Sequence, residues 1–269
     1  RIQDKDRDTN DWFLGREKTY KFLRKRSYVF GCYQWAAVEH RGEAAWPRVC
    51  SCSGALDLFL QKKGAFYQNK SHWTKEPMAH IVPHWNFKGL EGKEILVTVY
   101  TNCEESELFL NGESLGKQQI EKYGHGEWNV KYTPGTLEVK GYIGGKEVCS
   151  DKRVTTGKPV ALRLTRDNDF TANGSDIALF TCECVDENGL TVPDAAEYVH
   201  FSVTAPAKII GTGSDNCDHN NVANTERKMY MGKIRVAVKP KKGQESFTLT
   251  AMSDNCGVCE KTVSLCAEN

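Results

Sequence analysis

A tryptophan, two glutamates and a histidine stand close together near the start of the chain. They are Trp35, Glu39, His40 and Glu43. Carboxyl and imidazole groups often transfer protons in enzymes, so the paired glutamates could act as a general acid and a nucleophile. They could also form a structural salt bridge with a neighbouring arginine, and His40 could simply face solvent. The elements that hold these residues therefore decide what they can do.

Thiols form the second group of side chains that could do chemistry. The eleven cysteines are an odd number, and several occur in short pairs: Cys50 with Cys52, Cys182 with Cys184, and Cys256 with Cys259. A disulfide-stabilised module is usually shorter and evenly paired, and a zinc centre needs two ligand pairs brought together. We therefore expect reduced thiols that fill space, no bound metal and a cytoplasmic protein. A leader upstream of Arg1 would instead direct secretion.

Charge and hydropathy narrow the classes of partner. The 36 Lys and Arg residues nearly balance the 35 Asp and Glu residues, and the net charge is +1. Because the basic residues are scattered, we expect no nucleic-acid partner and no anionic-membrane partner. No apolar run approaches the ~20 residues that a membrane span needs. We therefore expect an uncharged partner.

The candidate residues follow a helix and an apolar segment. Aromatic and aliphatic residues recur near helical spacing through Trp12–Arg26, after possible N-cap side chains at Asp8, Thr9 and Asn10. The next segment, Tyr28–Trp35, is almost continuously apolar and aromatic, which is typical of a strand buried on both faces of a parallel sheet. Such a strand needs partner strands that this part of the chain does not offer.

The rest of the chain has the pattern of an all-β protein. Short alternating runs are separated by turn residues, among them Asn111-Gly112 and Gly144-Gly145, which suit tight hairpins. The runs form two sets on either side of Thr155–Pro159, a polar segment typical of a linker. The first set is Glu94–Tyr100, Glu107–Leu110, Trp128–Lys131, Thr136–Tyr142 and Lys146–Val154; the second is Ala161–Thr165, Ile177–Val185, Val199–Thr204, Lys208–Gly211, Lys233–Val238, Phe247–Ala251 and Lys261–Leu265.

Several motifs resemble glycoside hydrolase family 2. Tyr33–Glu43, followed by Trp46-Pro47, resembles the family segment W-T-G-F-D-Y-x-G-E and then W-P, although Ala36 to His40 depart from it. The continuation resembles the family's K-D-x-x-Y, S-x-W, H-I-x-P-H-W-N-x-x-G, V-x-V-Y-T-N and V-E-L-F-L-N-G lines at Lys62–Tyr67, Ser71–Trp73, His80–Gly89, Val97–Asn102 and Glu107–Gly112. The family's C-terminal sandwich is similar to Val185–Gly189, Val192–Ala195 and Ile209–Gly213.

The resemblance implies a mainly β fold, with two tandem immunoglobulin-like β-sandwiches preceded by the last α/β piece of a (β/α)₈ barrel. Residues 1–75 would be the incomplete end of the barrel, and residues 76–157 and 158–269 the two sandwiches. Such enzymes are retaining exo-glycosidases, with two glutamates ~5 Å apart and no cofactor. Both glutamates are expected upstream of Arg1, so we expect no catalytic residue here and no hydrolysis by this chain alone.

The resemblance also gives the candidate residues a role in substrate binding. Trp35 would stand at the C-terminal end of a barrel strand, where its flat ring packs on a pyranose, unless it is a core residue that caps the barrel. Glu39, His40 and Glu43 would hydrogen-bond sugar hydroxyls. The tripeptide His84-Trp85-Asn86 would mark the contact between the barrel and the first sandwich.

The identity of the substrate and the class of the protein leave alternatives. We expect a β-galactosidase; β-mannosidase stays open, and β-glucuronidase is less favoured because no Asn-x-Lys pair stands around Ser51–Ser53. The expected partners are a carbohydrate and the barrel and N-terminal domains of the parent enzyme, and a homo-oligomer stays open. The rival is a non-catalytic carbohydrate-binding or adhesive protein in which residues 1–75 are an independent module. The gene sequence upstream of Arg1 distinguishes the two.

Overall fold

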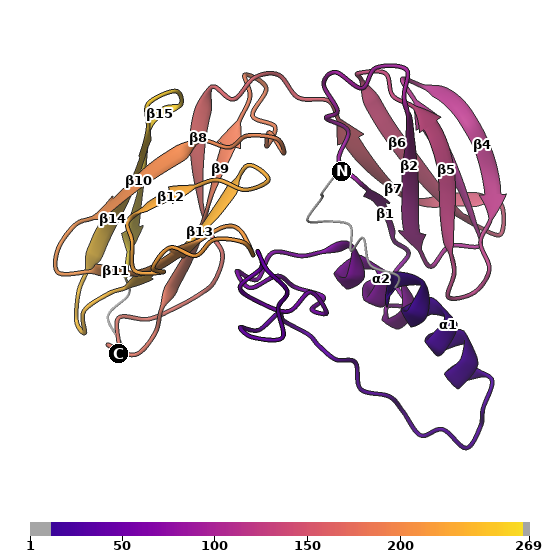
Figure 1. Ribbon diagram of the computed structural model, residues 1–269, viewed down its shortest axis with the longest axis horizontal. Coiled ribbons are helices and arrows are strands. Elements are labelled where there is room, and N and C mark those ends of the chain that lie inside the picture. The colour runs from indigo at the N-terminus through magenta and orange to yellow at the C-terminus, as the bar shows by residue number, and fades with distance from the viewer. Residues whose placement is uncertain (1–11, 266–269) are drawn as a thin grey trace. The chain divides into compact units, whose positions relative to one another are not determined.

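The computed structural model describes residues 12–265 and is mainly β (Figure 1). These residues form two compact units. One contains the residues up to Ala44 together with Cys50–Thr155, and the other contains Ala45–Val49 together with the residues from Thr156 onward. The helices of the described part are both too short and too polar to cross a bilayer.

Both helices belong to the first unit. Helix α1 (Trp12–Arg24) confirms the predicted helix. It carries Lys21 and Arg24 in its last turn, where positive charge interacts favourably with the negative end of the helix dipole. The proposed N-cap residues Asp8, Thr9 and Asn10 lie outside the described residues. Helix α2 (Gly64–Trp73) packs against strands β1 (Ala79–Val82) and β2 (Glu94–Thr101), with the Tyr67 ring stacked on His80 of β1 at a centroid distance of 3.2 Å.

The predicted strand Tyr28–Trp35 does not form. This segment is irregular, and no described strand pairs with it. Tyr28 and Trp35 are 80% and 70% exposed, and Phe30 and Tyr33 are fully exposed. The physical reason is that a strand exists through hydrogen bonds to its neighbours, and nothing in the described chain supplies them. The assignment of residues 1–75 to a barrel therefore stays a prediction.

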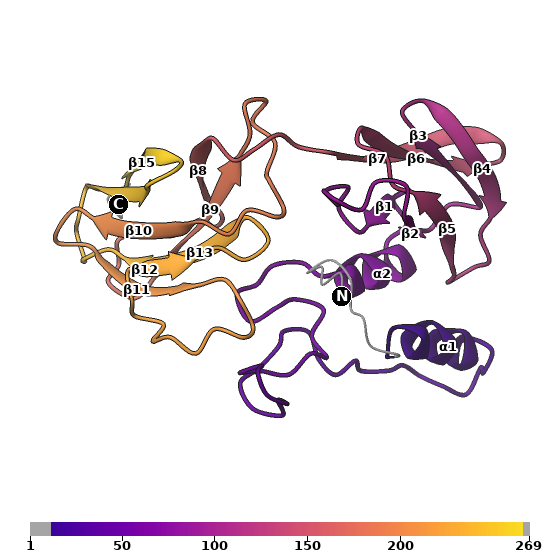
Figure 2. The ribbon, with the colours of Figure 1, turned by 45° about the horizontal axis from the view of Figure 1, so that its top comes forward.

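The remaining strands of the first unit form two antiparallel sheets, which lie in two layers in Figure 2. The three-stranded sheet has the order β1 (Ala79–Val82), β2 (Glu94–Thr101), β5 (His125–Lys131). The four-stranded sheet has the order β4 (Glu113–Gln119), β3 (Glu105–Leu110), β6 (Thr136–Ile143), β7 (Lys146–Val154). We call these two sheets the first sandwich.

The core of the first sandwich contains Trp85, which we had expected at a contact with a barrel. Its side chain is fully buried, and its indole N–H donates to the Thr133 carbonyl oxygen at 3.0 Å. For Trp85 the expectation is wrong because the sandwich itself surrounds the ring, with Tyr132 at a centroid distance of 5.1 Å; for His84 and Asn86 it stays a prediction. The hairpin turns at Asn111-Gly112 and Gly144-Gly145 have the positive φ values that their residue types predict.

The second unit contains two four-stranded antiparallel sheets, which we call the second sandwich. Their orders are β12 (Glu226–Lys228), β10 (Tyr198–Val203), β14 (Ser246–Ser253), β15 (Gly257–Ser264), and β11 (Lys208–Gly213), β13 (Lys233–Lys239), β9 (Ala178–Val185), β8 (Ala161–Arg166). Alternate residues of β9, β13 and β14 fill the core between the sheets. No described sheet takes strands from both sides of Thr155–Pro159, while the domain limits at residues 75 and 157 stay predictions.

Candidate functional site

Trp35 presents its ring to solvent from a backbone that is held in place. The chain around it is bound by hydrogen bonds from the Ala36 amide to the Ser53 carbonyl oxygen (3.3 Å) and from the Ala55 amide to the Ala36 carbonyl oxygen (3.1 Å). The ring meets His40 edge-on, with a centroid distance of 5.4 Å and an angle of 68° between the rings. An exposed aromatic face on a fixed backbone is a surface on which a flat or apolar ligand face can pack.

Glu39 points into the protein. Its side chain has no exposed area, and its Oε1 lies 2.5 Å from Lys63 Nζ in a buried ion pair. Its Oε2 lies 3.5 Å from Cys50 Sγ, and Lys63 also donates to the Cys52 carbonyl oxygen at 3.1 Å. Glu39 thus ties the loop of Trp35 to the residue that precedes α2.

Gly54 makes the close approach of this loop possible. A Cβ atom at Gly54 would lie 2.4 Å from the Glu39 amide nitrogen and 2.5 Å from the Leu56 carbonyl oxygen. The Glu39 amide donates to that same oxygen at 3.0 Å. Only glycine leaves room for this contact. Sequence reasoning assigned no role to Gly54 or Lys63, although Lys63 lies in one of the motifs.

His40 and Glu43 lie on the outer side of the loop. His40 Nε2 is 3.7 Å from Glu43 Oε2, and the Glu43 side chain is 69% exposed. The His40 backbone is held by Ser51, whose amide donates to the His40 carbonyl oxygen at 2.9 Å and whose hydroxyl accepts from the His40 amide at 3.2 Å. Trp35, His40 and Glu43 are therefore brought together, and Glu39 lies beneath them.

The exposed groups of this loop can stack and form hydrogen bonds, and they do not include a catalytic pair of carboxylates. The loop offers an aromatic face, an imidazole and one exposed carboxylate, which suits stacking and hydrogen bonding to a polyhydroxylated ring. Double displacement needs two carboxyl groups facing one bond ~5 Å apart, and the second glutamate of this loop is buried and ion-paired. Residues 12–265 contain no cluster of three or more His, Cys, Asp or Glu side chains placed to hold a metal ion.

Helix α1 is held against the first sandwich by a charged network that the sequence did not suggest. Glu17 Oε2 lies 2.6 Å from His125 Nδ1 on β5, and Lys21 bridges Glu17 (2.5 Å) and Glu121 (2.6 Å). Burial opposes the charge on His125, but the hydrogen bonds and negative charges of Glu17 and Glu127 together outweigh burial and raise the His125 pKa above its ordinary value. Burial also opposes the charge on Glu17, and the bonds to His125 and Lys21 nevertheless lower its pKa.

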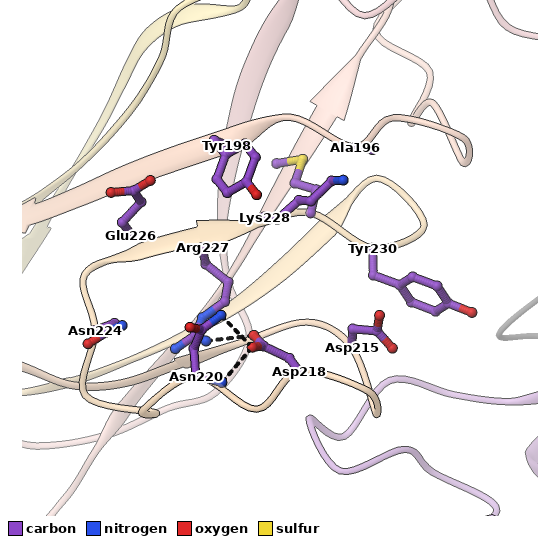
Figure 3. Close-up of a pocket in the computed structure, with 11 residues that line it drawn as sticks. Ala196, Tyr198, Asp215, Asp218, Asn220, Asn224, Glu226, Arg227, Lys228 and Tyr230 are labelled. Carbon is purple, nitrogen blue, oxygen red and sulfur yellow. Dashed lines mark hydrogen bonds and ion pairs between the residues drawn. The ribbon is translucent and has the colours of Figure 1, made fainter. Parts of the chain in front are cut away.

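A polar pocket of about 620 Å³ lies in the second sandwich, beside β10 and β12 (Figure 3). Its buried cation, Arg227, is already used by Asp218 (2.6 Å), the Asn221 carbonyl oxygen (2.7 Å) and the Thr212 hydroxyl. Burial opposes the charge on Asp218, whereas the Asn220 amide and Arg227 lower its pKa. The charged groups therefore stabilise the turn around the pocket, and we assign the pocket no ligand.

Comparisons with known proteins give consistent results. Residues 162–262 match the model of glycoside hydrolase family 2 C-terminal domain 5, and residues 92–149 match a domain of unknown function. The chain is 33% identical over 264 residues to a β-galactosidase of Bacteroides ovatus, covering 96% of this chain and 31% of that protein. It is 32% identical over 250 residues to a β-glucuronidase of Formosa agariphila, covering 90% of this chain and 25% of that protein.

Solved structures show the same fold. A family 2 glycosyl hydrolase of Bacteroides cellulosilyticus is 29% identical, with a TM-score of 0.88 over 93% of this chain and 38% of that one. A β-glycosidase of Bacteroides vulgatus is 27% identical, with a TM-score of 0.86 over 93% of this chain and 32% of that one. The chain spans between about a quarter and a third of the length of the curated relatives named above.

Proposed function

We propose that this chain, which belongs to glycoside hydrolase family 2 and matches the C-terminal part of its relatives, contributes one wall of the sugar-binding site of a retaining exo-β-glycosidase. The observation that carries the proposal is the exposed ring of Trp35, held on a fixed loop with His40 and Glu43 beside it. An exposed tryptophan next to hydrogen-bonding groups matches the two faces of a pyranose, one apolar and one polar.

Each residue of the loop has a distinct part in this proposal. The Trp35 ring packs on the C–H face of the terminal sugar, and His40 and Glu43 hydrogen-bond its hydroxyl groups. Glu39 is a positioning residue, because its buried pair with Lys63 fixes the loop and leaves it no free surface. The acid that protonates the leaving oxygen and the carboxylate that attacks the anomeric carbon come from the upstream part of the parent enzyme.

The exposed aromatic residues before Trp35 support the proposal that an upstream barrel completes the site. Tyr28, Phe30 and Tyr33 place large apolar side chains in water, which is unfavourable by about 25 cal/mol for each Å². Strands of an upstream barrel would cover these side chains and give the segment its hydrogen-bonding partners. We therefore propose that the barrel of the parent enzyme is the partner of Tyr28–Trp35. The cellular compartment and the assembly state stay predictions.

The favoured substrate is a β-galactoside, and a β-glucuronide is the alternative. A uronate carboxylate needs a cation beside it, and Lys63 is already committed to Glu39 and to the Cys52 carbonyl oxygen. The β-glucuronidases among the relatives, such as that of Formosa agariphila, make the glucuronide the substrate to test against it. β-Mannosides form the third arm of that test.

The test is an activity assay on the longer gene product, with nitrophenyl β-galactoside, β-glucuronide and β-mannoside as substrates. We expect turnover of the galactoside by the longer product and none by the present chain. Trp35→Ala should lower kcat/KM by about 10- to 100-fold, since each tenfold loss corresponds to about 1.4 kcal/mol of transition-state binding.

The matched control is Tyr198→Ala, which removes an aromatic ring that is 57% exposed on β10 of the second sandwich. This variant should keep full activity. Full activity in Trp35→Ala would remove the stacking role. Turnover by the present chain that is lost in Glu43→Gln would show that the loop itself carries catalysis, contrary to the proposal.

A further inference from the structure

We propose that Cys103 and Cys149 are an oxidisable thiol pair, which closes into a disulfide when the protein meets a small-molecule disulfide such as oxidised glutathione. Their Sγ atoms are 3.4 Å apart, although the two residues are 46 positions apart in the chain. Cys103 lies in the connection between β2 and β3, which passes from one sheet of the first sandwich to the other, and Cys149 lies on β7. The disulfide would tie this connection to β7.

The backbone beneath the sulfur atoms is shaped to let them meet. Gly141 on β6 is the register partner of Cys149, and a Cβ atom at Gly141 would lie 2.7 Å from both sulfur atoms. A side chain at this position would push the thiols apart. Cys103 is further fixed by its amide, which donates to the Thr101 hydroxyl at 3.0 Å. The contact is therefore set by the sheet and not by a flexible loop end.

The pair is also prepared for reaction. The Cys149 thiol hydrogen-bonds Cys103 and, despite opposing burial, lowers the Cys103 pKa to about 6, whereas the Cys149 pKa is raised because its thiol holds the shared proton. The pair thus loses its first proton below neutral pH, and a thiolate is the species that attacks a disulfide. Cys149 is partly exposed and Cys103 is buried, so a reagent reaches Cys149 first.

The reaction is two thiol–disulfide exchanges. The shared proton passes from Cys149 to Cys103 across their 3.4 Å contact, the resulting Cys149 thiolate attacks one sulfur of oxidised glutathione, and a glutathione thiolate leaves. Cys103 then gives the shared proton to solvent and attacks Cys149 Sγ, the mixed disulfide breaks, and the second glutathione thiolate leaves and takes up that proton. The two protein thiols lose two electrons, and one glutathione disulfide is reduced to two thiols.

A second thiol pair in the same chain provides the internal control. Cys184 on β9 and Cys256 in the turn between β14 and β15 have Sγ atoms 3.7 Å apart. Burial raises the pKa of both thiols, and Cys184 is buried in the core. Nearly equal sulfur distances therefore come with opposite tendencies to ionise. We expect this pair to stay reduced while Cys103 and Cys149 react.

The experiment incubates the chain with oxidised glutathione between pH 5 and 8, alkylates the remaining thiols and identifies linked peptides by mass spectrometry. We expect a Cys103–Cys149 link, a rate that rises with a midpoint near pH 6, and alkylated Cys184 and Cys256. The unfolding midpoint of the first sandwich should rise by about 5–10 °C on oxidation. Cys103→Ser should accumulate a glutathione adduct on Cys149, and Cys256→Ser should change nothing at the first pair.

Two results would overturn the proposal. One is that Cys103 and Cys149 stay reduced, and are therefore recovered in alkylated form, although the reagent has linked or modified other cysteines. The other is linkage of Cys184 to Cys256 at an equal or higher rate. Circular dichroism of each serine variant, compared with the unaltered chain, establishes that the variant is folded before its thiols are counted.

Discussion

The first sandwich and the segment Tyr28–Trp35 are both rich in aromatic residues, but the sandwich buries its rings and the segment exposes most of its rings. Trp85 and Tyr132 are at most 1% exposed, whereas Phe30 and Tyr33 stand fully in solvent. Each sheet of the sandwich has the other sheet to cover its apolar face, whereas no sheet in the part of the chain that the structure describes pairs with the segment. The difference teaches that an apolar run does not form a buried strand by itself. It also needs a neighbouring strand that pairs with its backbone hydrogen-bonding groups.

The largest expected effect contrasts one aromatic residue from each region. Trp85→Ala removes a fully buried ring and its hydrogen bond to Thr133, so the free energy of unfolding should fall by about 3–5 kcal/mol. Phe30→Ser removes a fully exposed ring and should change it by less than about 0.5 kcal/mol. Urea denaturation of both variants measures the contrast. A large loss for Phe30→Ser would mean that the segment is packed within this chain.

The next comparison lies within the loop of Trp35, between its two glutamates. Glu39→Gln leaves Lys63 as a buried cation without its partner and should destabilise the first unit by roughly 3–5 kcal/mol. Glu43→Gln alters an exposed group and should cost about 0.5 kcal/mol or less.

The double variant Glu39→Gln, Lys63→Met removes the uncompensated charge and should recover part of the lost stability. Equal effects of Glu39→Gln and Glu43→Gln on the free energy of unfolding would contradict the positioning role of Glu39. Urea denaturation at constant pH is again the measurement.

The smallest effect concerns pH and the attachment of α1. The raised His125 pKa means that its contribution is complete below its ordinary value of 6.5 and is lost as pH rises through the raised pKa. The lowered Glu17 pKa means that its contribution is complete above its ordinary value of 4.5 and is lost as pH falls through the lowered pKa. Attachment of α1 should therefore be strongest between pH 4.5 and 6.5.

Within that window Glu17→Gln should lower the free energy that holds α1 on the sandwich by about 1 kcal/mol. The value is small because solvent partly screens the Glu17 side chain. Amide exchange of α1 at several pH values measures the effect. An exchange profile that is the same in the variant and the unaltered chain would show that the network does not hold the helix.

Much of the β architecture could be predicted from the sequence, because alternation and turn residues are local signals. Strand β5 alternates buried and exposed residues along its whole length, and Asn111-Gly112 marks the hairpin turn between β3 and β4. Strand β4 was not predicted, since its residues are almost all exposed and give no alternation. The three-residue strand β12 is too short to show any pattern.

The candidate site was predictable only in part. The four residues of the loop were identified from their types and their motif, and the exposure of Trp35 and Glu43 agrees with a surface role. The pairing of Glu39 with Lys63 joins residues 24 positions apart, and no local pattern indicates such a contact. The need for glycine at position 54 likewise depends on a backbone approach that exists only in the folded chain.

The central claim is that Tyr28–Trp35 has no partner strand among residues 12–265 and gains partner strands in the parent enzyme. Hydrogen exchange of the amides of residues 28–35, followed by mass spectrometry, tests it directly in the present chain and in the longer gene product. We predict rapid exchange in the present chain and strong protection in the longer product, with the amides of β2 and β5 protected in both. Equal exchange of residues 28–35 in the two proteins, whether rapid or slow, would contradict the account.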